Sequence, residues 1–233
     1  MLNHYYCLFS GGFDSTLAIL KTISENSPLK LTCIFFNYGQ KASVRESEAV
    51  TALFPGIKAF ASNIDTNTII DEPRIINIPG LFSWSSSSIL VGNPKEGDTG
   101  VENRNLLLLS CLSSVIMADR KNSRKKGNVV IITGFTDSYY DTSLKFRDAI
   151  NAFFKATTQH IKVSTPLIPE NQNENEEVTV DELIKVAKSL NVLPLLDKTT
   201  WSCYFPSQTE TCGTCDQCKK RLKITQALKP ERS

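Results

Sequence analysis

The sequence is poor in histidine and carries almost no net charge. Its 233 residues include two histidines, His4 and His160, which leaves little room for a histidine-based catalytic triad or a multi-histidine metal centre. The 26 basic and 24 acidic residues give a formal charge of +2. Binding of nucleic acid through bulk electrostatics needs a larger positive excess, so nucleic acid is not expected as a partner.

Long apolar runs are also missing. No stretch reaches the roughly 18 apolar residues that a membrane span requires, and the first residues lack the positive and apolar regions of a secretory signal. A composition of 41% hydrophobic and 21% charged residues is typical of a globular protein. We therefore expect a cytoplasmic location and no membrane contact. The length allows a single domain, 1–233, with a small appendage.

Alternating strand and helix patterns predict an α/β fold. An apolar run at 5–9, helical spacing of apolar residues at 17–23 and a β-rich run at 31–36 predict a βαβ unit with parallel strands. Further helices are expected at 45–53, 105–118, 146–161 and 179–190, and further strands at 57–60 and 129–133. Thr179 and Glu182 fit a capping box at the start of the last helix. The pattern is typical of a three-layer, Rossmann-like fold with a parallel sheet.

Three polar stretches are expected to lie outside these elements. The stretch 75–100 is rich in serine, glycine and proline and predicts a long loop or lid. The stretch 120–126 predicts a basic turn, and 170–182 predicts an exposed acidic loop. The loop and the basic turn could dock a partner, although a basic turn is usually just solvated.

A glycine-containing segment, SGGFDST at 10–16, joins the first predicted strand to the first predicted helix. Backbone N–H groups at a helix N-terminus bind phosphate, and the helix dipole adds to them. Gly11 and Gly12 allow the backbone to approach a ligand closely. The hydroxyl donors are Ser10, Ser15 and Thr16. The carboxylate of Asp14 has the same charge sign as phosphate. A Mg²⁺ ion that bridges the carboxylate and the phosphate would explain its position.

Other interpretations of this loop stay open. It lacks the lysine of the G-x-x-x-x-G-K-[ST] loop and does not match G-x-G-x-x-G, so neither of those nucleotide sites is expected. The alternative is a glycine-rich turn without a ligand, in which Asp14 would only cap the helix.

Four of the seven cysteines crowd near the C-terminus: Cys203, Cys212, Cys215 and Cys218. Four thiolates in a tetrahedron are typical ligands of structural zinc, and two-residue spacers let adjacent cysteines face one ion. We therefore expect Zn²⁺ to clamp the segment 198–233 onto the domain. An iron–sulfur cluster, a catalytic dithiol and buried free thiols are the alternatives. The other cysteines are expected in the core: Cys7, Cys33 and Cys111.

The loop and the cysteine cluster together resemble a known family. The loop at 10–15 looks like the pyrophosphate loop of the PP-loop ATPases, the adenine nucleotide α-hydrolase-like group. Over nearly its whole length the chain is similar to the QueC family, the 7-cyano-7-deazaguanine synthases of the queuosine pathway. The other segments that carry the similarity are FNYGQK at 36–41, VENRN at 101–105, ITG at 132–134, WSCY at 201–204 and CGTCDQCKKR at 212–221.

The resemblance implies an ATP-dependent ligase that forms C–N bonds. Enzymes of the family adenylate the carboxylate of 7-carboxy-7-deazaguanine and release pyrophosphate. Ammonia then gives an amide, and a second ATP carries the amide to the nitrile with loss of AMP. Charge developing at phosphorus needs cations and N–H dipoles rather than a covalent nucleophile, which suits a chain with few histidines.

The resemblance also implies roles for individual residues. ATP and its Mg²⁺ would be bound by Ser10, Gly11, Gly12, Phe13, Asp14, Ser15, Thr16 and Gly134. The expected catalytic residues are Asp14, Arg104 and Lys198. The expected substrate contacts are Tyr38, Gln40, Lys41, Asp137, Asp141 and Arg147. Outside the loop, the competing interpretation is that these are ordinary surface or capping residues.

The sequence departs from the family after Gly134. The family usually reads D-[YF]-S-G-Y-P-D-C-R there, whereas 136–148 reads TDSYYDTSLKFRD. Arg147 keeps its place, while the Tyr-Pro-Asp-Cys portion is lost. This departure leaves two products open. One is the nitrile, and the other is a protein conjugate, because QueC-like proteins of anti-phage systems are thought to join a deazaguanine to a protein amine. Two further alternatives are a non-catalytic, zinc-containing binding module and a PP-loop enzyme that thiolates tRNA. A homodimer is also left open.

Overall fold

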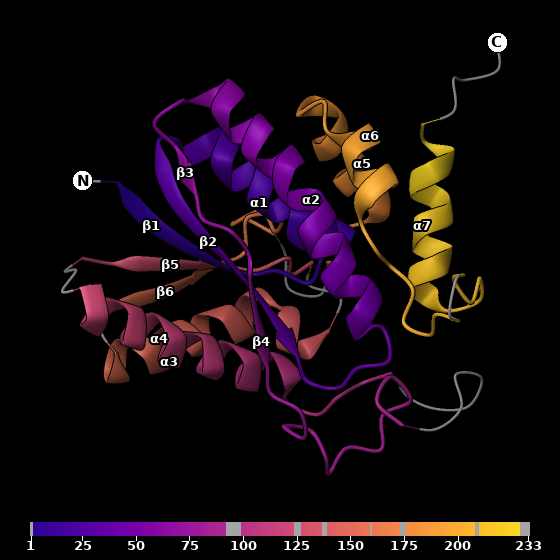
Figure 1. Ribbon diagram of the computed structural model, residues 1–233, viewed down its shortest axis with the longest axis horizontal. Coiled ribbons are helices and arrows are strands. Elements are labelled where there is room, and N and C mark those ends of the chain that lie inside the picture. Colours follow the sequence, from indigo (N-terminus) through magenta and orange to yellow (C-terminus); the bar gives the residue numbers. More distant parts are fainter. Residues whose placement is uncertain are drawn as a thin grey trace.

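Strand β1 (Asn3–Leu8) lies in the middle of a parallel sheet (Figure 1). The computed structural model describes residues 2–91, 99–123, 127–136, 139–158, 160–172, 176–207 and 210–228. Within these ranges the strand order is β3-β2-β1-β5-β6, with β4 also paired to β2, and every pair is parallel. The other strands are β2 (Leu29–Asn37), β3 (Ile69–Ile70), β4 (Arg74–Asn77), β5 (Val129–Ile132) and β6 (Ile161–Ser164).

Helices cover both faces of the sheet (Figure 1). One face carries α1 (Phe13–Asn26), α2 (Ser43–Ile64), α5 (Val180–Ser189), α6 (Leu193–Thr199) and α7 (Asp216–Gln226). The other carries α3 (Arg104–Ser123) and α4 (Leu144–Thr157), and the short 3₁₀ helix η1 (Tyr140–Thr142) precedes α4. The predicted three-layer α/β fold is therefore confirmed. Across the described ranges, each helix falls short of the length and apolar character needed to cross a bilayer.

Successive residues of β1 belong to two different hydrophobic cores. Tyr5 and Cys7 pack with residues of α1 and α2, whereas Tyr6 packs with residues of α3 and α4. Side chains of a strand point alternately to opposite faces, and a parallel sheet covered by helices on both faces buries both sets. This explains why the segment is apolar throughout instead of alternating with polar residues.

One predicted strand is wrong. Residues 57–60 belong to the second half of α2, which continues through Pro55. Leu53, Ile57 and Ala61 are buried at a spacing of four, so the apolar residues that suggested a strand form the buried face of a helix.

Other boundaries differ from the predictions. Most of β4 falls in the predicted loop at 75–100, and residues 92–98 of that stretch lie outside the described residues. The helix expected at 146–161 ends at Thr157, and β6 begins at Ile161. The predicted basic turn is helical as far as Ser123, and 124–126 are not described. Short strands such as β3 and β6 have too few residues to show a period.

The carboxyl ends of β1 and β5 meet where the chain changes direction across the sheet. β1 leads through α1 to β2 on one side, and β5 pairs with β1 on the other side. In open parallel sheets, ligands bind at the carboxyl ends of the strands at such a switch point. The loop after β1 and Gly134 after β5 both lie there, so the fold brings them together.

Candidate functional site

The loop between β1 and α1 requires glycine at position 11. Gly11 has a φ of +71°, in the left-handed region that glycine adopts without strain. A Cβ there would lie 2.8 Å from the carbonyl oxygen of Glu46, because α2 packs directly on the loop. Gly12 is the N-cap of α1, and the first amides of an α-helix have no carbonyl partner within the helix. The loop therefore presents amides without an intrahelical partner at the carboxyl end of the sheet.

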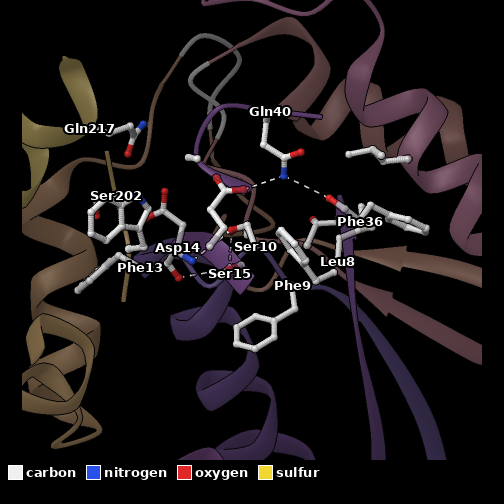
Figure 2. Close-up of a pocket in the computed structure, with 18 of the residues that line it drawn as sticks. Leu8, Phe9, Ser10, Phe13, Asp14, Ser15, Phe36, Gln40, Ser202 and Gln217 are labelled. Atoms are coloured by element: carbon white, nitrogen blue, oxygen red, sulfur yellow. Dashed lines mark hydrogen bonds between the residues drawn. The ribbon is translucent and has the colours of Figure 1, made fainter. Parts of the chain in front are cut away.

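The hydroxyl groups of the loop divide into two kinds. Ser10 Oγ and Ser15 Oγ lie 3.0 Å apart, and Gly12 N donates to Ser10 Oγ at 3.3 Å. Ser15 Oγ donates to the Gly12 carbonyl at 3.2 Å. Thr16 is fully buried, and its hydroxyl donates to the Gly12 carbonyl at 2.7 Å. Ser10 and Ser15 line the cavity beside the loop (Figure 2), whereas Thr16 does not and stabilises the first turn of α1.

A cavity of about 260 Å³ opens beside this loop (Figure 2). The predicted nucleotide-binding residues that line it are Ser10, Gly12, Phe13, Asp14, Ser15 and Gly134. Gly11 and Thr16 are buried behind the loop and do not line the cavity. Of the predicted substrate and catalytic residues elsewhere, the structure brings Tyr38, Gln40 and Arg104 to the same cavity.

Asp14 forms an ion pair with Lys220 of α7. The Lys220 Nζ lies 2.7 Å from Asp14 Oδ1 and 2.6 Å from Asp14 Oδ2. Both side chains are mostly buried, with exposed fractions of 18% for the lysine and 26% for the aspartate. The Asp14 carboxylate, which the sequence predicts to lie near Mg²⁺, is therefore bound by the Lys220 ammonium in this structure.

Arg104 is the first residue of α3, in the helical layer on the other side of the sheet. Burial acts to lower the pKa of Arg104, but Tyr38 and Tyr204 raise it above its ordinary value. The guanidinium is therefore a permanent cation in a partly dehydrated cavity. Such a group binds carboxylate or phosphate oxygens through paired hydrogen bonds.

Glu46 of α2 is a second carboxylate in the cavity. Burial raises the pKa of Glu46 to about 6, although the Gln40 amide and the Arg104 guanidinium favour its charged form. Gln40 Nε2 donates to Glu46 Oε2 at 2.8 Å and to the Phe36 carbonyl at 3.3 Å. Gln40 Oε1 also accepts from the Tyr38 amide at 2.9 Å. Gln40 thus fixes both the glutamate and the strand end that carries Tyr38.

Several predicted site residues lie away from this cavity. Lys41 is exposed, and its Nζ donates to the carbonyls of Ser88 and Val91. Lys198 is exposed on α6. Neither lysine is among the residues that line the cavity.

Two further predicted contacts also fall outside the lining. Asp141 is buried in η1, and Arg147 pairs with Asp148 and Glu170 at the surface of α4. Asp137 lies outside the described residues.

Several residues that line the cavity are not predicted from the sequence: Glu46, Trp201, Ser202, Tyr204, Gln217 and Lys220. The Trp201 amide donates to the Gly11 carbonyl at 2.9 Å, so the segment before Cys203 is tied directly to the loop. The available signal is proximity to the clustered cysteines: Trp201, Ser202 and Tyr204 flank Cys203, and Gln217 and Lys220 flank Cys218. For Glu46 the sequence offered no signal beyond a helical charge.

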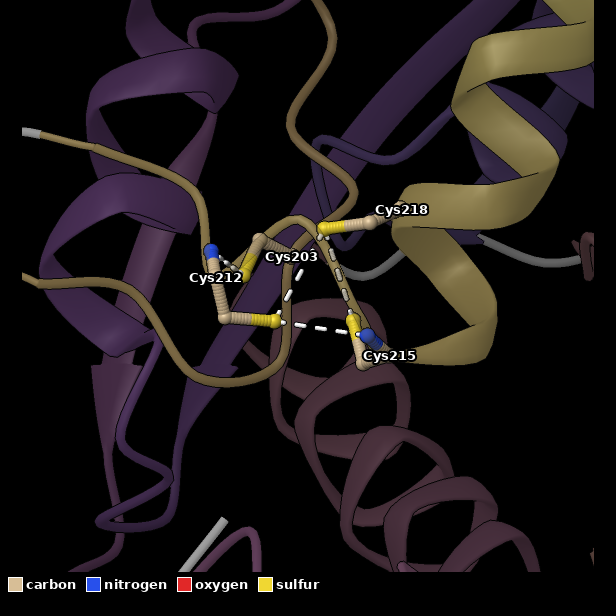
Figure 3. A group of neighbouring side chains, drawn as sticks. All are labelled: Cys203, Cys212, Cys215 and Cys218. Carbon is tan, nitrogen blue, oxygen red and sulfur yellow. Dashed lines mark hydrogen bonds between the residues drawn. The ribbon is translucent and has the colours of Figure 1, made fainter. Parts of the chain in front are cut away.

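The four clustered cysteines face one another (Figure 3). Their sulfur atoms all lie within 4.8 Å of one another, as expected for ligands about 2.3 Å from one ion. Cys203 Sγ accepts backbone N–H groups from Phe205 at 3.3 Å and Cys212 at 3.2 Å. Donors of this kind stabilise thiolates, which are the form that binds metal. The geometry and the donor set therefore fit a metal ion.

The pKa values within the cluster diverge, and burial raises that of the Cys203 thiol. Burial acts to raise the pKa of the Cys212 thiol, but hydrogen bonds from the Thr214 and Cys215 amides lower it to about 6. Burial and the neighbouring Cys215 sulfur raise the pKa of Cys218, a penalty that a cation would remove.

Comparison with known proteins places this geometry in context. The family model described as "Queuosine biosynthesis protein QueC" matches residues 5–229. A 7-cyano-7-deazaguanine synthase from a Nitratiruptor species is 31% identical over 224 residues, which cover 93% of this chain and 90% of the relative. A protein of the same name from Campylobacter fetus subsp. fetus is 29% identical over 229 residues, with the same coverage. The solved structure of U34-tRNA thiolase NcsA from Methanococcus maripaludis aligns with a TM-score of 0.42 and 16% identity, over 97% of this chain and 63% of that one.

Proposed function

The chain belongs to the QueC family, and from this premise we propose that it uses ATP to activate the carboxylate of 7-carboxy-7-deazaguanine. Attack by ammonia then gives the amide, and a second activation gives 7-cyano-7-deazaguanine. One observation carries the proposal: the first-turn amides of α1 and the Arg104 guanidinium open onto the same cavity. A phosphate site and a carboxylate site must adjoin for an acyl adenylate to form.

Within this cavity we assign the polyphosphate of ATP to the loop. The first-turn amides of α1 and the hydroxyls of Ser10 and Ser15 supply hydrogen-bond donors, and the helix dipole favours the negative charge. Pyrophosphate is the leaving group when the substrate carboxylate attacks the α-phosphorus. Its charge is stabilised by donors already in place, which is the main source of catalysis in phosphoryl-type transfer.

We assign the substrate carboxylate to Arg104. A carboxylate must approach a negatively charged phosphate, so a cation beside it lowers the repulsion and orients the attacking oxygen. Among the described residues that line the cavity there is no cysteine or histidine, which agrees with attack by the substrate itself. Glu46 presents carboxylate oxygens to the same cavity and suits the N–H groups of a guanine-like ring.

We further propose that Mg²⁺ accompanies ATP and that the four cysteines hold Zn²⁺. When bound, Zn²⁺ would supply structural cross-linking and no chemistry, since all four of its positions are filled by thiolates. The segment 198–233 would then be a metal-stabilised appendage of a single domain. The reaction would take place in the cytoplasm, where ammonia and ATP are available.

Product analysis tests the proposed function. The purified chain is incubated with ATP, Mg²⁺, 7-carboxy-7-deazaguanine and ammonium, and the products are identified by mass spectrometry. The nitrile, with AMP and pyrophosphate, is the expected result. Failure to form AMP when the substrate is present would overturn the proposal. An adduct that forms only on an added protein would show that a protein amine replaces ammonia.

A further inference from the structure

Lys220 lines this cavity close to the loop after β1. Its ammonium bridges the two oxygens of Asp14, at 2.7 and 2.6 Å, in the first turn of α1. Both residues line the cavity beside Ser10, Gly12 and Ser15. Two of the three N–H bonds of an ammonium are needed for the pair. One donor of Lys220 is thus left for a ligand.

The position of Lys220 is fixed by the helix that carries it. Helix α7 begins directly after Cys215, which is its N-cap. The neighbouring Arg221 donates to the carbonyl of Leu196 at 3.2 Å and to the hydroxyl of Thr200 at 2.6 Å, and Ile224 is completely buried. The cysteine cluster and these contacts therefore hold the lysine over the loop.

A cation is needed beside Asp14 if the cavity is to bind a polyphosphate. Its charged lining residues are Asp14, Glu46, Arg104 and Lys220 within the described part of the chain. Polyphosphate is strongly negative, and an unneutralised carboxylate in the first turn of α1 would repel it. Arg104 lies on α3, in the other helical layer, so Lys220 is the cation of the loop itself.

We propose that Lys220 is a phosphate-contacting residue of the nucleotide site. On binding, its ammonium donates to an oxygen of the β- or γ-phosphate while still shielding Asp14. This role of Lys220 rests on one part of the proposed function, which is that the loop binds ATP. Because α7 starts at the cysteine cluster, the cluster contributes to nucleotide binding by fixing the position of Lys220.

Nucleotide affinities without turnover test the role. Calorimetric titrations use the full chain, with α,β-methylene-ATP as a polyphosphate that cannot be cleaved and with AMP as a ligand that lacks the β- and γ-phosphates. The variants are Lys220→Met, which keeps the length of the side chain, and Lys220→Arg, which restores the charge. Lys219→Met is the matched control, because Lys219 is exposed and pairs with Asp216.

The proposal predicts a selective loss. Lys220→Met should weaken binding of α,β-methylene-ATP by about tenfold or more relative to AMP, as expected for loss of one charge-assisted contact. Lys220→Arg should recover most of the difference, and Lys219→Met should behave as wild type. The double variant Asp14→Asn with Lys220→Met should stay weak, because the lysine contacts phosphate as well as shielding Asp14.

Three results would overturn the role of Lys220. The first is an unchanged ratio of the two affinities in Lys220→Met. The second is an equal loss of both ligands, which would mark a purely structural role. The third is full recovery in the double variant, which would mean that Lys220 only neutralises Asp14. A wild-type chain that binds neither nucleotide would instead overturn the proposed function.

Discussion

Gly134, at the end of β5, lies directly against Ser15 in the first turn of α1. A Cβ at position 134 would be 2.6 Å from the amide nitrogen of Ser15 and 2.8 Å from the carbonyl carbon of Asp14. Both atoms belong to backbone, which cannot rotate away as a side chain can. The close approach of β5 to α1 is therefore what sets the loop at 10–16 beside the rest of the cavity.

Gly134→Ala should displace the start of α1. The added methyl group meets backbone, so we expect a loss of roughly 1–3 kcal/mol in the free energy of unfolding and a fall in ATP affinity of more than tenfold. Chemical denaturation and titration with α,β-methylene-ATP measure the two effects. Gly56→Ala in α2 is the control, because the atoms nearest to a Cβ there belong to the flexible side chain of Leu195 and not to backbone. Wild-type nucleotide affinity in Gly134→Ala would contradict the prediction.

Arg104→Gln should reduce kcat/KM for the deazaguanine carboxylate by about a hundredfold, since a charge-assisted, paired contact is lost. The affinity for α,β-methylene-ATP should change much less. Arg120→Gln, in the last turn of the same helix, is the control, because Arg120 binds the Gly127 carbonyl and does not line the cavity. Steady-state kinetics with each substrate varied separately give the answer. Equal losses for both substrates would argue against a carboxylate site at Arg104.

Lys198→Ala should leave activity within about twofold of wild type. Lys198 was a candidate catalytic residue on sequence grounds, but it is exposed on α6 and does not line the cavity. Surface substitutions of this kind usually change stability by less than about 0.5 kcal/mol. Rates of AMP formation with saturating substrates test it. A large loss in kcat would restore the catalytic role and require α6 to move toward the cavity.

Glu46 should make stability depend on pH near pH 6. Burial raises the pKa of Glu46 from 4.5 to about 6, so the folded chain binds this proton more tightly than the unfolded chain does. Its favourable contribution is complete below pH 4.5 and is lost as the pH rises through about 6. A shift of this size corresponds to about 2 kcal/mol.

Glu46→Gln removes this titration. Between about pH 4.5 and 7.5, the wild type should lose about 2 kcal/mol of unfolding free energy relative to Glu46→Gln. Chemical denaturation at several pH values measures the difference. Glu48→Gln is the control, since Glu48 lies on the surface of the same helix and pairs with Arg45. A pH-independent difference between wild type and Glu46→Gln would show that Glu46 has an ordinary pKa.

Cys215→Ser should abolish metal binding and lower the melting temperature. With three sulfur ligands left, a tetrahedral site is incomplete, and α7 loses its anchor at its N-cap. We expect the metal content to fall from about one ion per chain to nearly none, with a stability loss of a few kcal/mol. Metal analysis and thermal unfolding are the measurements, and zinc is the metal expected in the wild type.

Cys111→Ser is the control for the cysteine variant. Cys111 lies on α3, far from the cluster in sequence and only partly exposed. Its replacement should leave the metal content unchanged. Iron in place of zinc, or full metal retention in Cys215→Ser, would contradict the assignment of a four-cysteine zinc site.

Contiguous motifs were predicted well because their geometry is local. The turn after β1, the capping box at Thr179 and the helix that begins near Arg104 all follow from neighbouring residues. In the capping box the Thr179 amide donates to Glu182 Oε2 at 2.8 Å, as the sequence predicted. The segment 57–60 failed because apolar residues spaced for a helix also satisfy a short strand pattern.

The sequence by itself determined the glycine turn after β1 and the clustered thiols, since residues a few positions apart set the backbone turn and the spacing of the cysteines. The tertiary structure alone decided which distant side chains share the cavity. It placed Lys220 against Asp14, 206 positions away, brought Glu46 near Arg104 and left Lys198 at the surface. These outcomes depend on how helices from both layers pack around the sheet, and a packing arrangement of that kind has no local pattern in the chain.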